Sequence, residues 1–220
     1  MKKILLSIIT VSLMTAGYSQ AVSDRNTIPV AVNLNRVLRM SVNTGGNIEF
    51  TFNTIDQYKK GISGDQNTSS SAGTVAANPM YVTTFTVAAS TKWRLDYGAE
   101  DATFIGVDNP TNTLLTLDNV GFTLASTGVH VFGTELNSTP IGATFDEIAA
   151  LQQYPVVLIT DGGNAAANAG DALDNAFTMT WRCGTAEAGN TTPMNTVKLI
   201  EQGLAPDRYV TNVLFNLVAI

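Results

Sequence analysis

The chain contains one cysteine and one histidine in 220 residues, and these scarcities exclude several kinds of chemistry. Cys183 cannot form a disulfide within the chain, so a large hydrophobic core must provide the stability. One cysteine and one histidine are too few ligands for a structural zinc ion. A serine-hydrolase triad would need His130, yet the motif Gly-x-Ser-x-Gly does not occur. We therefore expect no enzyme, no catalytic residues, no metal site and no cofactor. His130 alternates with Val129 and Val131 and is predicted to face solvent.

Positive charge is scarce as well. Without Lys2 and Lys3, ten basic residues stand against eighteen acidic ones, a net charge of −8. Proteins that bind nucleic acids present basic patches instead. Nucleic acid is therefore excluded as an expected partner.

Long hydrophobic runs are absent after the first residues. Lys2 and Lys3 precede an apolar run, Ile4 to Met14, and small residues follow at Gly17 and Ser19. This order is typical of a signal peptide, predicted to span residues 1–19. No later run approaches the roughly 20 apolar residues of a membrane helix. The sequence predicts a secreted protein, extracellular or on the cell surface, without membrane insertion.

The most informative feature that is present follows this signal. Apolar residues occupy every second position over fifteen residues, with Arg36 as the exception: Ile28, Val30, Val32, Leu34, Leu38, Met40 and Val42. Such a period of two is typical of a half-buried β-strand, but ordinary strands end after about five or six residues. The stripe therefore either crosses between two sheets of its own domain or reaches into a neighbouring molecule. We expect residues 20–35 to form an N-terminal extension and residues 36–220 a single domain.

Most of that domain is predicted to form short strands, in which apolar and polar residues alternate, joined by turn residues. Thr44 to Asn47 contains two glycines and precedes the alternating residues Ile48, Phe50 and Phe52, which predicts a β-hairpin. Residues 177–183 place Cys183 on the apolar face of a strand, so we expect a buried thiol. Residues 209–220 are apolar on both faces, which predicts a strand that is central or covered. Residues 144–147 match a capping box and predict one short helix. The fold class is an all-β antiparallel sandwich with one short helix and an extended N-terminal strand.

Two polar segments are predicted as loops, residues 56–78 and residues 161–175. The second contains Asp161, Asp171 and Asp174, and oxygen-rich loops bind calcium, but the spacing is not that of an EF-hand. A solvated turn is the simpler interpretation. Five aromatic residues are candidates for stacking on sugars: Trp93, Tyr97, Tyr81, Trp181 and Tyr154. Trp93 and Trp181 lie on alternating apolar faces, which favours the core.

Four segments together resemble the secreted, pilin-like β-sandwich proteins of the Bacteroidetes and, more loosely, fimbrial subunits that assemble by strand exchange. They are the signal ending Gly17 to Gln20, the stripe 28–42, the segment 93–95 and the ending Pro206 to Tyr209 that leads into residues 213–217. The resemblance implies an immunoglobulin-like or pilin-like sandwich in which the N-terminal strand of one subunit completes the sheet of the next. Two departures stand out: the lipidated cysteine of the phylum's lipoprotein fimbrillins is missing, and a closing strand is present.

The leading hypothesis is a structural subunit of an extracellular filament or surface layer, whose partner is a second copy of itself. Its candidate polymerisation residues are Ile28, Val30, Val32 and Leu34. The alternative is a monomeric carbohydrate-binding or adhesin-like sandwich that uses the two polar loops to bind surface glycans.

Overall fold

The computed structural model describes residues 28–64, 79–142, 147–163, 168–187 and 191–220. The predicted signal peptide and residues 20–27 lie outside this range. The chain divides into two units, residues 1–35 and residues 36–220. Residues 28–37 belong to no strand, so the predicted stripe forms a regular strand only in its second half.

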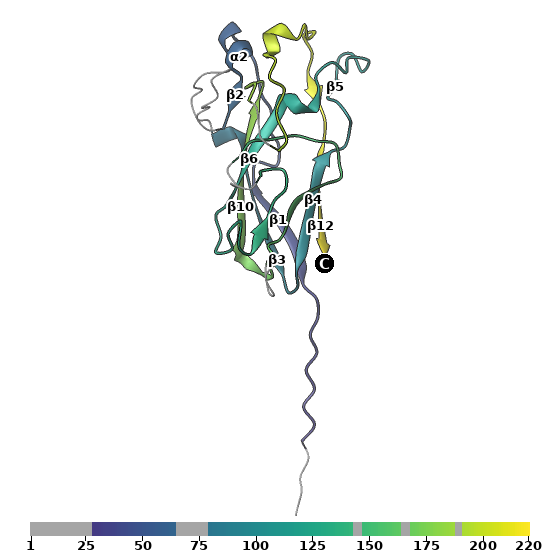
Figure 1. Cartoon of the computed structure of the whole chain (residues 1–220). Coiled ribbons are helices and arrows are strands. Elements are labelled where there is room, and N and C mark those ends of the chain that lie inside the picture. Colours follow the sequence, from purple (N-terminus) through teal and green to yellow (C-terminus); the bar gives the residue numbers. More distant parts are fainter. Residues whose placement is uncertain (1–27, 65–78, 143–146, 164–167, 188–190) are drawn as a thin grey trace, which may run out of the picture. The chain divides into compact units, whose positions relative to one another are not determined.

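Residues 36–220 form an all-β sandwich in which every pairing between named strands is antiparallel (Figure 1). The larger sheet has the order β1 (Leu38–Thr44), β3 (Val82–Ala89), β10 (Gly170–Cys183), β6 (Val120–Ser126) and β8 (Ala149–Ala150), and β2 (Ile62–Ser63) also pairs with β10. The second sheet has the order β12 (Val213–Ala219), β4 (Trp93–Ala99), β9 (Val156–Asp161) and β7 (Leu136–Asn137). A small pair joins β5 (Ile105–Gly106) to β11 (Tyr209–Val210).

Helices are short. The α-helix α2 spans Ile55–Lys60, and 3-10 turns occur at η2 (Pro79–Tyr81), η3 (Leu117–Asn119) and η4 (Leu199–Glu201). Helix α2 starts at a capping box, in which Thr54 Oγ1 accepts from Gln57 N–H and Gln57 Oε1 accepts from Thr54 N–H. The prediction of loop from residue 56 onward was therefore wrong for the first turns of this segment. Among the described residues, no helix is long and apolar enough to cross a membrane.

Aromatic side chains from both sheets fill the core. Phe177 of β10 stacks on Phe85 of β3 at 5.0 Å between ring centroids and meets the edge of Trp93 of β4 at 6.1 Å. Trp181 and Cys183 of β10 are also buried. The burial of these residues confirms the core positions that the alternation from residue 177 to residue 183 predicted. Both tryptophans pack inside the sandwich.

The predicted β-hairpin at residues 44–53 is wrong. Strand β1 pairs with β3, with Leu38 opposite Ala89 and Val42 opposite Phe85, and residues 45–53 form no strand. Gly45 has φ +67°, and a Cβ there would lie 2.1 Å from the carbonyl oxygen of Val82. This glycine therefore lets the chain pass close to the start of β3, rather than reverse into a hairpin.

The predicted position of the last strand is also wrong. Strand β12 lies at the edge of the second sheet and pairs only with β4. Its apolar pattern indicated a covered strand, but no described residue of the chain pairs with its other edge. Local pattern cannot distinguish an edge strand from a central one, because the sheet order depends on distant segments.

Two smaller expectations also failed. The residues at 143–146 lie outside the described range, but Ala149 and Ala150, predicted to continue a helix, instead pair with Phe122 and Gly121 of β6. His130 is half-buried, with its Nδ1 3.1 Å from Asn175 Oδ1, whereas Val129 and Val131 are exposed. In both cases a contact with a distant strand outweighed the local pattern.

Candidate functional site

The N-terminal segment, residues 28–35, exposes all of its large apolar side chains. Ile28, Val30, Val32 and Leu34 are 83%, 84%, 75% and 91% exposed. Single exposed hydrophobic residues are ordinary on protein surfaces, whereas four in one short segment make that segment a candidate interaction site. Covering one such side chain is worth about 1.5–3 kcal/mol. The four residues that the sequence predicts to share an apolar face are thus all open to solvent.

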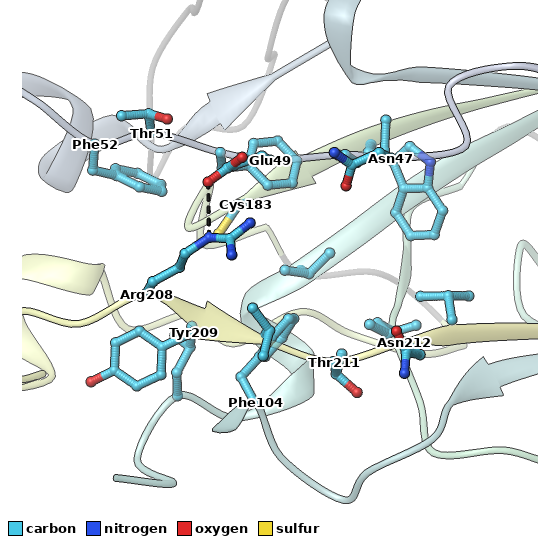
Figure 2. Close-up of a pocket in the computed structure, with 18 of the residues that line it drawn as sticks. Asn47, Glu49, Thr51, Phe52, Phe104, Cys183, Arg208, Tyr209, Thr211 and Asn212 are labelled. Carbon is cyan, nitrogen blue, oxygen red and sulfur yellow. Dashed lines mark hydrogen bonds and ion pairs between the residues drawn. The ribbon is translucent and has the colours of Figure 1, made fainter. Parts of the chain in front are cut away.

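A large groove opens within the sandwich domain, with a volume of about 910 Å³. One wall is the stretch after β1, and the other runs from residue 204 through β11 into β12 (Figure 2). Figure 2 shows the two walls running in opposite directions, with Thr51, Glu49 and Asn47 facing Arg208 to Asn212. The groove thus lies between the segment that follows β1 and the segment that leads into β12, and these two strands are each at the edge of a sheet.

The first wall, residues 46–52, resembles a strand without partners. Ile48, Phe50 and Phe52 are half-buried and pack against the core, while Glu49 and Thr51 are exposed. Phe50 stacks on Tyr81 with 4.5 Å between ring centroids. No backbone group of residues 46–52 forms a hydrogen bond with any described residue. Backbone N–H and C=O groups ordinarily have partners, so this wall is unusual in the described part of the chain.

The second wall also has one free edge. Asn212 accepts a hydrogen bond from Glu100 N–H, and Ile220 donates to Lys92 C=O. The backbone N–H and C=O groups of the even-numbered residues of β12 therefore point toward β4. Because antiparallel pairing alternates, the backbone groups of the odd-numbered residues 213–217 point away from β4, toward the unpaired edge.

Asp207 fixes the loop that leads into this wall. Its carboxylate accepts backbone N–H bonds from Asp108 (3.0 Å), Asn109 (3.3 Å) and Arg208 (2.7 Å), and a side-chain bond from Asn112. The Asp108 N–H, followed by the other donors, lowers the pKa of the Asp207 carboxyl below its ordinary value. The carboxylate thereby ties the wall to the loop after β5.

One ion pair spans the groove. Arg208 Nε donates to Glu49 Oε1 at 3.1 Å, as the dashed line in Figure 2 shows. The two side chains are 62% and 54% exposed. An ion pair this open to water contributes little stability, so it does not hold the walls firmly together.

The floor of the groove is mostly apolar. Its buried residues are Thr83, Leu115, Val120, Leu151, Trp181, Cys183 and Leu199. Burial raises the pKa of the Cys183 thiol to about 12, so the thiol remains neutral at physiological pH. The floor thus offers apolar contacts and no nucleophile.

The other candidates from the sequence do not assemble into a site. Asp161 ends β9, and Asp171 and Asp174 lie in β10, so the predicted loop at 161–175 is wrong at both ends. Asp161 pairs with Lys92 at 2.6 Å, while Asp171 and Asp174 accept N–H bonds from neighbouring residues where the register of β10 with β3 shifts. Within the described part of the chain, no three acidic, histidine or cysteine side chains gather as metal ligands. Calcium at this loop has no support among these residues.

Sequence analysis missed the groove. Its lining comes from three distant parts of the chain, and the one local signal, the alternation of Ile48, Phe50 and Phe52, was interpreted as half of a hairpin. No family model matches the sequence, and no curated protein is significantly similar to it.

Proposed function

We propose that the protein is a structural subunit of an extracellular filament or surface layer, and that copies polymerise by β-strand exchange through residues 28–34. The single observation that supports this proposal is the solvent exposure of the apolar row Ile28, Val30, Val32 and Leu34. Four such side chains placed in a neighbouring molecule, with a ladder of backbone hydrogen bonds, suffice to hold a polymer together.

The sequence of the segment suits an inserted strand. Residues 28–35 carry no charge, and small or polar residues alternate with the apolar ones: Pro29, Ala31, Asn33 and Asn35. A strand of this pattern buries one face and leaves the other acceptable to water. The proposed partner is therefore a second copy of the chain, not a membrane or a nucleic acid.

A matched pair of aspartate substitutions tests the proposal. In V32D the new carboxylate lies on the apolar row, whereas in N33D the same charge lies on the opposite face. Burying an unpaired carboxylate costs several kcal/mol, and about 4 kcal/mol weakens an association roughly a thousandfold. We expect V32D to remain monomeric at concentrations where the unmodified mature protein and N33D assemble. Sedimentation velocity and electron microscopy measure the outcome.

Deletion of residues 20–35 gives the complementary test. The buried core among the described residues comes entirely from residues beyond 36, so the shortened chain should fold and stay monomeric. A shortened chain that still polymerises would contradict the proposed role of the segment, as would a V32D protein that assembles like N33D.

The glycan-binding alternative has no specific observation in its favour. Of the five aromatic residues considered for sugar stacking, four are buried (Trp93, Trp181, Tyr81 and Tyr97) and Tyr154 is half-buried. Stacking on a sugar requires an accessible aromatic face, so the four buried side chains do not offer a binding platform.

A further inference from the structure

We infer that the groove between residues 46–52 and residues 208–215 is the place where one copy receives residues 28–34 of a second copy as an added strand. This inference rests on the proposed function and assigns the acceptor, which the exposed N-terminal segment alone leaves open. Three features of the groove support it: its length, its unpaired backbone and its polarity.

The lengths agree. The first wall has seven residues without backbone partners, 46–52, and the apolar row from Ile28 to Leu34 also spans seven. At roughly 3.3 Å per residue in a strand, each extends about 23 Å. A strand of that length matches the wall from end to end.

Both walls of the groove have backbone N–H and C=O groups that an added strand can pair with. The backbone N–H and C=O groups of residues 46–52 have no hydrogen-bond partner among the described residues, and β12 presents its odd-numbered residues at an edge that no described strand pairs with. Free edges of this kind recruit a further strand, which satisfies their N–H and C=O groups. A strand placed here would also cover β12, whose sequence is apolar on both faces.

The polarity of the two surfaces is complementary. The floor contains Trp181, Leu115 and Leu199, and the half-buried wall residues Phe50 and Phe215 extend the apolar surface. The only ion pair recorded across the described groove residues, Glu49 with Arg208, is exposed to solvent. An uncharged segment that buries one apolar face therefore suits this site, whereas a charged peptide does not.

Cysteine cross-linking in the full mature chain tests the assignment. One cysteine is placed on the polar face of the segment (A31C or N33C), and one on an exposed wall position (N47C, E49C or T51C). Singly substituted proteins are mixed in all six donor and wall combinations, allowed to assemble, and treated with a mild oxidant. Neighbouring strands bring paired residues to Cβ distances that a disulfide can bridge. We expect at least one combination to give disulfide-linked dimers containing one chain of each kind.

The matched control is L173C, at an exposed apolar residue outside the groove. Each singly substituted protein alone controls for reaction with the buried Cys183. Mixed dimers confined to wall positions support the inference. If the protein assembles but no wall combination cross-links, or L173C cross-links equally well, the groove assignment is overturned while strand-mediated assembly stands. If the unmodified protein never assembles, the proposed function fails, and this inference fails with it.

Discussion

Two arginine–glutamate pairs show how burial decides what an ion pair does at the scale of single residues. Arg182 Nη1 contacts both carboxylate oxygens of Glu187, at 3.0 and 3.1 Å, and both side chains are 4% exposed. Arg208 and Glu49 form a contact of similar length in solvent. The first pair lies under the sandwich surface, whereas the second lies at the groove.

The substitutions E187Q and E49Q make this contrast measurable. Because E187Q removes the negative charge beside a buried guanidinium, we expect it to lower the free energy of unfolding by about 3–5 kcal/mol. The same change at Glu49 should cost under about 1 kcal/mol, since water already screens that pair. Urea unfolding of the monomer measures both values. Equal losses would show that the buried pair contributes no more than the exposed one.

At the scale of elements, the wall segment 46–52 differs from the strands beside it. Strand β3 pairs on both sides, with β1 and with β10, whereas residues 46–52 have no backbone partners among the described residues. Amide hydrogens exchange slowly only where hydrogen bonds protect them. The segment is thus held in place by Ile48, Phe50 and Phe52 rather than by a ladder.

Hydrogen exchange should reveal this difference and its consequence. In the monomer we expect amides of residues 46–52 to exchange orders of magnitude faster than those of β3 and β10, because only the strands are paired. After assembly, the same amides should become protected, since an added strand supplies acceptors. Mass spectrometry of peptides from monomeric V32D and from assembled N33D compares the two states. Protection that is identical in both would argue against strand addition at this wall.

At the scale of the whole molecule, the proposed assembly requires each copy to donate its N-terminal segment and to receive that of another copy in its groove. A chain shortened by residues 20–35 keeps the groove but has nothing to donate. We therefore expect a sub-stoichiometric amount of it to terminate growing polymers and shorten them, because each added copy leaves the end without a donor segment. Polymer lengths measured by electron microscopy test this expectation.

The control for that experiment is an equal amount of N33D, which retains both parts and should leave the lengths unchanged. Circular dichroism shows whether the shortened chain folds. If it folds and the polymers still keep their full length, growth does not proceed by each copy donating its N-terminal segment to the next.

The alternation of apolar residues predicted the sandwich and much of its core. Phe177, Trp181 and Cys183 lie inside as expected, because a period of two sends every second side chain to one face whatever the strand pairs with. The same local rule misassigned His130, which is half-buried and contacts Asn175. It also misassigned Gly45 to a hairpin turn, since glycine serves equally in a reversal and in a close approach to another strand.

The sequence by itself determined the all-β class, the buried thiol and the apolar row at residues 28–34, because these depend on residue type and local period. Only the tertiary structure decided that β12 is an edge strand, that residues 46–52 have no partner strand and that the two border one groove. Sheet order and backbone pairing join distant segments, such as β4 and β12, whose paired residues Ala99 and Val213 are more than a hundred positions apart. Their free energies depend on which strands meet, and no local pattern of residues encodes that choice.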